Sequence, residues 1–163
     1  GQARLLLSEL ISSMSTRTKQ DGNALVNILE KFISLAREYA DKKGIFVNNA
    51  ISEMLKEFTE YPSGYGFTQA ISKYWDAYES CNDVLRDNAL RWLRAEYTTK
   101  TDSIRDLGIR EILNDSSLFN TLILYSILAR KAGYKGLLVC LDEMVNLYKI
   151  SNSEYKLKAF VST

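Results

Sequence analysis

The sequence predicts a mainly α-helical fold, a helical bundle of about six helices with one short β-strand. Apolar residues recur at three- and four-residue steps through most of the first 132 positions, and Pro62 is the sole proline. One continuous apolar run, Leu137–Leu141, follows a glycine-bounded turn near the end of the chain. Hydrophobic residues make up 46% and charged residues 25% of the 163 positions, which is ordinary for a globular chain with a buried core.

Six segments carry the helical spacing of apolar residues. Their apolar positions lie within residues 6–14, 25–39, 51–58, 71–78, 85–93 and 118–127. Asp21 and Thr68 are the predicted N-caps of the second and fourth helices. Gly44 and Gly133 are the predicted stops of the second and sixth helices. The stretch Pro62–Gly66 is the clearest predicted loop.

Three shorter features are predicted between residues 101 and 116. Residues 101–107 favour a short helical turn, and residues 109–113 are a weak strand candidate. Asp115 or Ser116 is predicted to open the sixth long helix, because both residue types are good N-caps.

The apolar run Leu137–Leu141 is too short for an independent helix. A run of this length between Gly136 and an acid is typical of a strand buried on both faces, as in a parallel sheet. In open α/β folds, ligands bind outside the carboxyl ends of such strands. Asp142 and Glu143 occupy that position.

Composition excludes much chemistry. The chain has no histidine, which rules out a Ser-His-Asp triad, a Cys-His pair and most zinc sites. Cys81 and Cys140 are far apart, so we expect reduced thiols and a cytoplasmic setting. A net charge of +1 provides no general attraction to nucleic acid or to a membrane surface. No apolar stretch approaches the roughly 20 residues of a membrane helix, and we expect no membrane contact.

An apolar strand followed by two acids is the Walker B pattern of P-loop ATPases. Asp142 would then hold Mg²⁺ through water beside the ATP phosphates, and Glu143 would be the catalytic base that activates the attacking water. The alternative is a core strand followed by a helix N-cap, in which Asp142 caps residues 144–148. The pattern alone leaves both interpretations open.

The other half of a P-loop nucleotide site is missing from the sequence. No G-x-x-x-x-G-K-[ST] occurs, and neither Gly64–Gly66 nor Gly133–Gly136 replaces it. Tight phosphate binding needs the amides and lysine of that loop, so we expect this chain alone to be a poor ATPase. Because the chain starts at Gly1 rather than Met, we expect an internal piece of a longer protein.

Four arginines are candidates for a phosphate sensor or an arginine finger. They are Arg91, Arg94, Arg105 and Arg110. Aspartates and glutamates are interleaved with them, which favours a solvated face with local ion pairs.

Three segments resemble the bacterial BREX-system ATP-binding proteins, whose relatives are associated with tellurium-resistance gene clusters. They are Gly133–Lys149, the Ala89–Tyr97 segment with Thr99–Thr101 and Arg105–Gly108, and Gly1–Arg4. The resemblance spans nearly the whole chain, and its Walker B stretch is the most specific part.

The resemblance implies a larger, AAA-like P-loop ATPase that binds ATP and Mg²⁺ and acts in phage defence, where other defence-system proteins are possible partners. Residues 1–133 would form a helical insertion or lid. Residues 134–163 would contribute the Walker B strand and the following segment of the P-loop core. The phosphate-binding loop would lie upstream of Gly1, and further strands downstream of Thr163.

The competing hypothesis is a non-catalytic helical protein–protein interaction module. The apolar strand would then pair with another chain, and self-association through its edges is expected. A third hypothesis, nucleic-acid binding, lacks the expected excess of basic residues.

Overall fold

The computed structural model describes residues 1–141 and the backbone of 158–162, and these form a mainly helical fold, as predicted. The elements are α1 (Gln2–Ser13), α2 (Leu25–Lys43), α3 (Val47–Leu55), η1 (Lys56–Glu60), α4 (Gly64–Ser80), α5 (Asp83–Leu93), α6 (Lys100–Leu107), η2 (Asp115–Ser117), α7 (Leu118–Lys131), β1 (Gly136–Cys140) and β2 (Lys158–Ser162). None of the described helices has the length and apolar character needed to cross a membrane.

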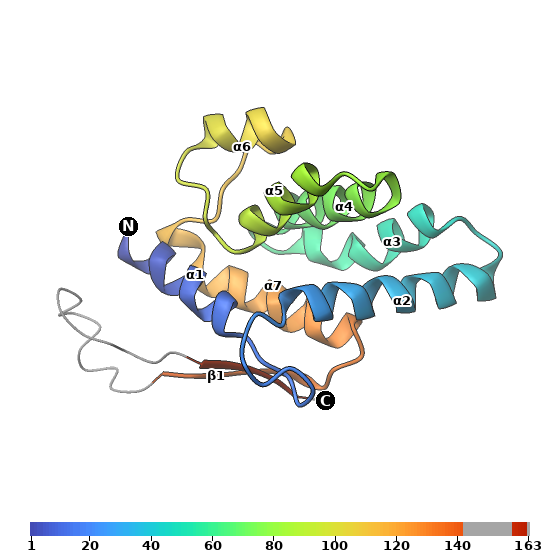
Figure 1. Ribbon diagram of the computed structural model, residues 1–163, viewed down its shortest axis with the longest axis horizontal. Coiled ribbons are helices and arrows are strands. Elements are labelled where there is room, and N and C mark those ends of the chain that lie inside the picture. The colour runs from blue at the N-terminus through green and yellow to red at the C-terminus, as the bar shows by residue number, and fades with distance from the viewer. Residues whose placement is uncertain (142–157, 163) are drawn as a thin grey trace.

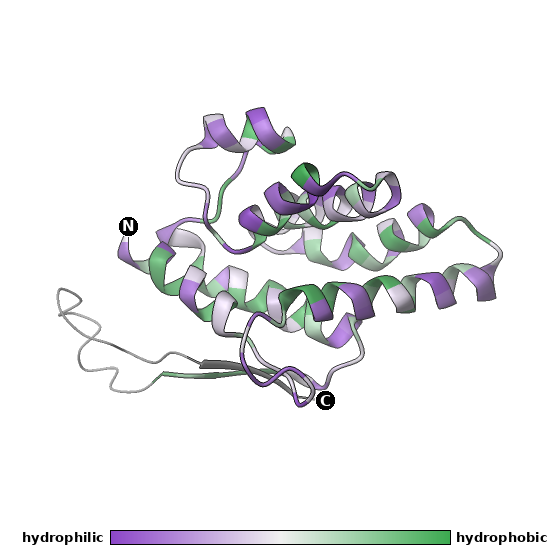
Figure 2. Ribbon diagram, in the orientation of Figure 1, coloured by the Kyte–Doolittle hydropathy of each residue, from purple (hydrophilic) through white to green (hydrophobic). Residues whose placement is uncertain are grey.

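Two helices, α2 and α7, form the middle of the molecule and contact each other (Figure 1). On one side of them lie α3, α4 and α5, with α6 beyond α5 at the top of the view. On the other side, the two strands form a ribbon that contacts α1 and α7. Hydrophobic and hydrophilic residues alternate along the helices (Figure 2), and nearly all the buried residues are hydrophobic.

The core is a continuous cluster that extends from α1 to the turn after α7. Phe67 of α4 lies at an aromatic junction within it: its ring is 5.7 Å from Phe58 of η1 and 5.1 Å from Tyr125 of α7. The Tyr125 hydroxyl donates to the Leu93 carbonyl at the end of α5, with a donor–acceptor distance of 2.5 Å. Burial raises the pKa of Tyr125, because the phenolate would be desolvated there.

The start of α2 differs from the prediction. The helix begins at Leu25, and Asp21 is not its N-cap. Gly22 and Asn23 have left-handed backbones, with φ of 87° and 55°, which prevents the helix from extending back to Asp21. The Asp21 carboxylate instead pairs with Lys19 at 2.7 Å. The predicted stop at Gly44 is confirmed, since this residue is left-handed at the C-cap.

The start of α4 also differs. Thr68 lies inside the helix, where its hydroxyl donates to the Tyr65 carbonyl at 2.7 Å, so it is not the N-cap. The helix begins at Gly64, whose backbone lies so close to the Phe58 carbonyl that a Cβ has no room. The predicted loop spans residues 62–66, and its residues 64–66 are helical. The helix starts at Gly64 because only glycine can approach the Phe58 carbonyl so closely.

The weak strand candidate, residues 109–113, is not a strand. Side chains bind its backbone instead. The Ser103 hydroxyl donates to the Ile109 carbonyl at 2.7 Å, and the Trp92 indole donates to the Glu111 carbonyl at 2.8 Å. These bonds hold the segment between α6 and η2 without a neighbouring strand.

The short helix η2, which leads into α7, is capped one or two residues earlier than the predicted N-cap. Asn114 is the N-cap, and its side chain accepts from the Ser116 amide at 3.0 Å, while the Ser117 hydroxyl accepts from the Asn114 amide at 2.8 Å. This reciprocal capping opens η2, which leads directly into α7.

The strand predicted at 137–141 is present as β1, but it is not buried on both faces. Leu138 is 59% exposed, whereas Leu137 packs against the core. The reason is that β1 pairs antiparallel with β2, with Gly136 opposite Ser162 and Cys140 opposite Lys158. An antiparallel ribbon can leave one face in solvent. β2 itself was not predicted.

Gly64→Ala should lower the free energy of unfolding by about 3 kcal/mol or more, since the new methyl group must displace backbone at Phe58. Gly136→Ala is the matched control, because nothing lies within 4 Å of a Cβ added there; its effect should stay within about 0.5 kcal/mol. Urea unfolding of both variants measures the difference. Equal stabilities would contradict the close approach.

Candidate functional site

The two predicted acids follow the carboxyl end of β1 in the sequence. α7 leads through a short turn into β1, which runs back beside α7, so the end of β1 and the start of α7 lie at the same end of the molecule (Figure 1). Asp142 and Glu143 directly follow Leu141 and lie outside the described residues. Their roles in Mg²⁺ binding and catalysis stay predictions.

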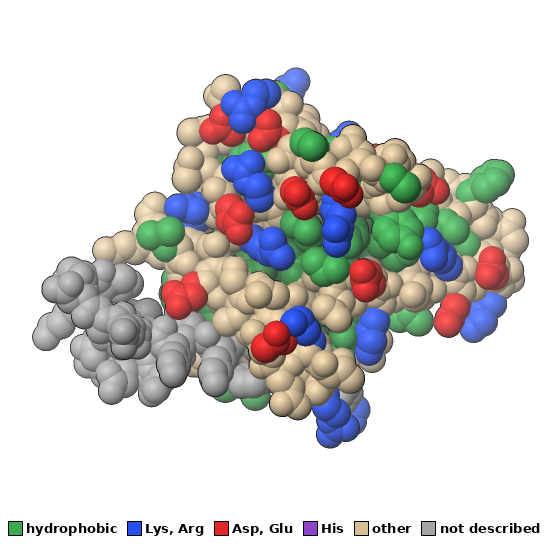
Figure 3. Space-filling model, viewed as in Figure 1, with side chains coloured by type: hydrophobic (Ala, Val, Ile, Leu, Met, Phe, Trp, Pro, Cys, Tyr) green, Lys and Arg blue, Asp and Glu red, His purple; other side chains and the backbone are tan. Residues whose placement is uncertain are grey.

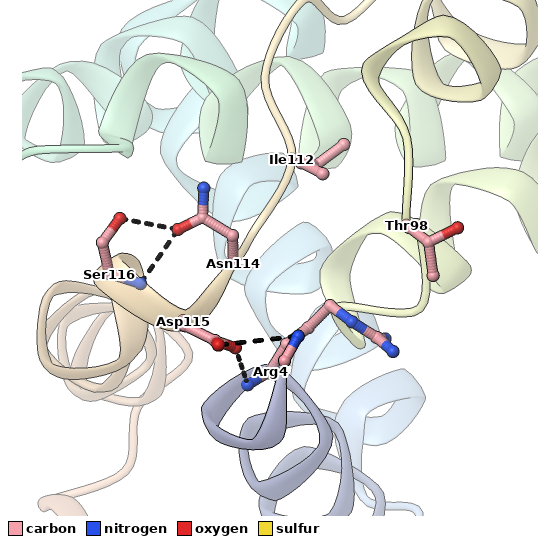
Figure 4. Close-up of a pocket in the computed structure, with 7 residues that line it drawn as sticks. Arg4, Thr98, Ile112, Asn114, Asp115 and Ser116 are labelled. Atoms are coloured by element: carbon pink, nitrogen blue, oxygen red, sulfur yellow. Dashed lines mark hydrogen bonds and ion pairs between the residues drawn. The ribbon is translucent and has the colours of Figure 1, made fainter.

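A polar pocket of about 420 Å³ opens at this end, beside the start of α7 (Figure 4). Its lining includes Arg4, Thr98, Ile112, Asn114, Asp115 and Ser116. A second pocket of about 270 Å³ shares three of these residues, Ile112, Asn114 and Ser116. Residues far apart in sequence thus meet at one end of the molecule.

Arg4 joins three of the elements around the pocket. Its backbone amide donates to Asp115 of η2 at 2.8 Å (Figure 4). Its guanidinium donates to the Ala95 carbonyl at 2.8 Å. Ala95 is buried and has a left-handed φ of 58° just after α5. The Asp115 carboxylate lies at the amino end of α1, where the helix dipole favours negative charge.

Part of the hydrogen-bonding capacity of the pocket is used within its own lining. The Asn114 side chain already accepts from the amide and the hydroxyl of Ser116, at 3.0 and 2.7 Å. The lining also combines one basic side chain, Arg4, with one acidic side chain, Asp115. No cluster of three or more metal-binding side chains occurs within residues 1–141 and 158–162.

Two of the candidate arginines form ion pairs, and those of Arg105 are local, as the interleaved acids predicted. The Arg105 guanidinium donates to Asp106 at 2.8 Å and to Asp102 at 2.7 Å. Arg91 lies 3.8 Å from Asp106, and its guanidinium lies over the Tyr97 ring at 4.6 Å. Basic and acidic side chains are interspersed over this face (Figure 3).

The other two candidates, Arg94 and Arg110, make no ion pair within the part of the chain that the structure describes. Arg94 is half-buried at the end of α5, and Arg110 is exposed after α6. A phosphate-sensing role for either residue stays a prediction.

Asp106 is the centre of this charged cluster. The Arg105 guanidinium, followed by the hydrogen bond from the Tyr97 hydroxyl at 2.9 Å, lowers the pKa of Asp106. Burial, and then the bond to Asp106, raises the pKa of Tyr97 to about 12. The cluster therefore favours an ionised carboxylate beside a neutral phenol at neutral pH.

Sequence reasoning missed the contacts that build the pocket. The capping signature around Asn114 was visible, although the cap was assigned one or two residues too late. The link from Arg4 to Ala95 had no sequence signal, because the acceptor is a backbone carbonyl.

The chain matches the model of a known family over nearly its whole length. The family model described as BREX system ATP-binding protein BrxC/D matches residues 1–162. No curated protein and no solved structure matches the chain. The resemblance to BREX-system ATP-binding proteins is confirmed by the family model.

Asp106→Asn should remove a pH-dependent part of the stability. The folded-state pKa of Asp106 is lowered, so its contribution is present above the unfolded pKa of about 4 and is lost as pH falls through the folded pKa. Urea unfolding from pH 7 to pH 3 should show the wild-type and variant stabilities converging in acid. The variant should also lower the pKa of Tyr97, read by tyrosinate absorbance, because its bond to a carboxylate is lost.

Asp87→Asn is the control for this prediction, since Asp87 is an exposed acid on α5. It should change neither the pH profile of stability nor the pKa of Tyr97. A constant gap between wild type and Asp106→Asn at every pH would show that the pairing at Asp106 is not the cause.

Proposed function

Because the chain belongs to the family of the BREX system ATP-binding protein BrxC/D, we propose that its intact parent is a Mg²⁺-dependent P-loop ATPase that acts in phage defence. The description of the family supports ATP binding itself. The observation that carries the finer proposal is the apolar strand β1, followed two residues later by the acids Asp142 and Glu143.

In this proposal Asp142 holds Mg²⁺ through water, and Glu143 is the base that activates the water attacking the terminal phosphate of ATP. Carboxylate oxygen is the ligand that Mg²⁺ prefers. The phosphate-binding loop is supplied by a part of the parent that lies outside this chain, because the sequence contains no such loop. The isolated chain is accordingly proposed to be inactive.

The proposed division of the chain places a helical insertion or lid at residues 1–133 and the Walker B part of the P-loop core at residues 134–163. All helices of the described part precede Gly133, which supports this boundary. We further propose a cytoplasmic protein whose partners are the nucleotide and other proteins of the defence system.

A non-catalytic interaction module is the second candidate, and one observation favours it. Phe119 and Ile123 lie four residues apart on α7 and are 77% and 44% exposed, and Leu138 on β1 is 59% exposed. Apolar side chains exposed at this spacing suit contact with another polypeptide. Nucleic-acid binding has no comparable support.

The ATPase proposal is tested in the intact parent protein with Glu143→Gln. The substitution keeps the volume of the side chain but removes the base, so kcat should fall by about 10² to 10⁴-fold while ATP still binds. Steady-state hydrolysis and nucleotide titration measure the two effects. Glu79→Gln, an exposed glutamate on α4, is the control and should leave kcat unchanged. Undiminished turnover in Glu143→Gln would exclude the assigned role.

The interaction-module candidate predicts self-association of the isolated chain through β1. Leu138→Lys should shift the chain toward monomer in sedimentation velocity, because the lysine places a charge on the exposed face of an edge strand. Val84→Lys is the matched control, since Val84 is 72% exposed on α5, away from the ribbon. A wild-type chain that is monomeric at all concentrations, or equal behaviour of both variants, would count against this candidate.

A further inference from the structure

A hollow of about 450 Å³, here called the α4 groove, lies between α2, α4 and α5. In the space-filling view, hydrophobic side chains are exposed between α2 and α5, with basic and acidic side chains beside them (Figure 3). The lining of the groove includes Glu30 of α2, Tyr74 and Tyr78 of α4, Cys81 in the turn after α4, and Asp83 and Arg86 of α5. Aromatic, basic and acidic side chains therefore meet in one hollow.

Tyr78 is the exposed ring of the groove, at 47% exposed. It stacks on Trp75, with the ring centroids 5.8 Å apart and 16° between the ring planes. The Trp75 indole donates to the Asn48 side chain, which fixes the orientation of the indole. The Arg37 guanidinium of α2 lies over both rings, 5.4 Å from the Tyr78 centroid and 5.6 Å from the Trp75 centroid. The two rings therefore hold an exposed arginine beside the groove.

A second arginine, Arg86 of α5, is also held over an aromatic ring. Its guanidinium lies 6.0 Å from the centroid of Tyr74, which is itself only 1% exposed and gives a fixed support. The start of α5 is fixed as well, because the Asn82 side chain caps it by accepting from the Leu85 amide at 3.1 Å. The groove thus presents two guanidinium groups that aromatic rings hold in place.

The groove also carries two acids, Glu30 and Asp83. Within the part of the chain that the structure describes, neither these acids nor Arg37 and Arg86 form an ion pair. A ligand of a single charge, such as a phosphate, would leave the opposite charges of the groove without partners. A second copy of the same face supplies both signs, so each guanidinium can meet a carboxylate. The charge pattern of the groove is therefore complementary to itself.

We propose that two copies of this chain associate face to face through the α4 groove, related by a two-fold axis. The two arginines of one copy meet the two acids of the other, and the exposed ring of Tyr78 is buried between the copies. Tyrosine, tryptophan and arginine are the side chains that contribute most at the centres of protein interfaces. This contact is separate from β1, which lies on the other side of the molecule from α4 and α5 (Figure 1). It does not depend on ATP hydrolysis by the intact parent.

The first test uses two charge-reversed forms of the chain, whose described part has a continuous core of its own. One form carries Arg37→Glu with Arg86→Glu, and the other carries Glu30→Lys with Asp83→Lys. In sedimentation velocity, each form alone should dimerise with a Kd at least about 10-fold higher than that of the wild type, because like charges then face each other. An equimolar mixture of the two forms should dimerise as the wild type does, because opposite charges face each other again.

Arg17→Glu with Arg110→Glu is the matched control. It changes the net charge by the same amount at two exposed arginines outside the lining of the groove, so it should dimerise as the wild type does. A wild-type chain that stays monomeric, or a mixture of folded charge-reversed forms that stays monomeric, would overturn the proposal. Circular dichroism shows whether the forms fold.

The second test needs no substitution, because the two cysteines of the chain are both exposed and lie at different places. Cys81 lines the α4 groove, and Cys140 lies on β1. Alkylation of Cys81 by a bulky maleimide should slow by about fivefold at a total concentration about ten times the dimer Kd, by mass action. Alkylation of Cys140 should keep its rate, and peptide mapping by mass spectrometry reads both sites. Protection of Cys140 alone would place the contact at β1 instead, and protection of neither cysteine would also refute association through the groove.

Discussion

The packing of Phe67 between Phe58 and Tyr125 is the interaction on which the rest of the structure depends. It joins η1, α4 and α7 in one desolvated contact, and the Tyr125 hydroxyl adds the end of α5 through the Leu93 carbonyl. Burying one such ring contributes about 2 kcal/mol. Tyr125 lies on α7, so this contact fixes the position of α7 and of the segments at its two ends. These segments are η2, beside the polar pocket, and the turn that leads into β1.

The helices were predictable because apolar residues repeat at helical spacing over whole segments, and burial of that face stabilises each helix. Their starts were less predictable. Asp21 is a good capping residue, but the left-handed backbones of Gly22 and Asn23 separate it from α2. Thr68 is likewise a good cap, but the close approach of Gly64 to the Phe58 carbonyl starts α4 earlier. Both errors arise where local backbone or tertiary contact overrides side-chain preference.

Some contacts of the candidate site could likewise be predicted from the sequence, and others could not. The ion pairs of Arg105 followed from acids one and three residues away, whereas Arg91 pairs with Asp106, 15 positions farther along the chain. The bonds from Arg4 to Ala95 and Asp115 connect residues 91 and 111 positions apart, and no pattern in the sequence marks them. β1 was located by its apolar run, whereas its antiparallel partner was not. The two acids lie outside the described residues, so their chemistry still rests on the sequence and on the family.

The long-range contacts of α1 have a consequence for how the chain folds during synthesis. Most of the helix contacts of α1 are with η2 and α7, more than 100 residues later, and its amino end is bonded to Asp115. Helices α2 to α5 can pair with near neighbours as they leave the ribosome. α1 is synthesised before α7 but can complete its helix contacts only after α7 has emerged. The apolar stripe of α1 therefore lacks its α7 partner until more than 100 further residues have been synthesised.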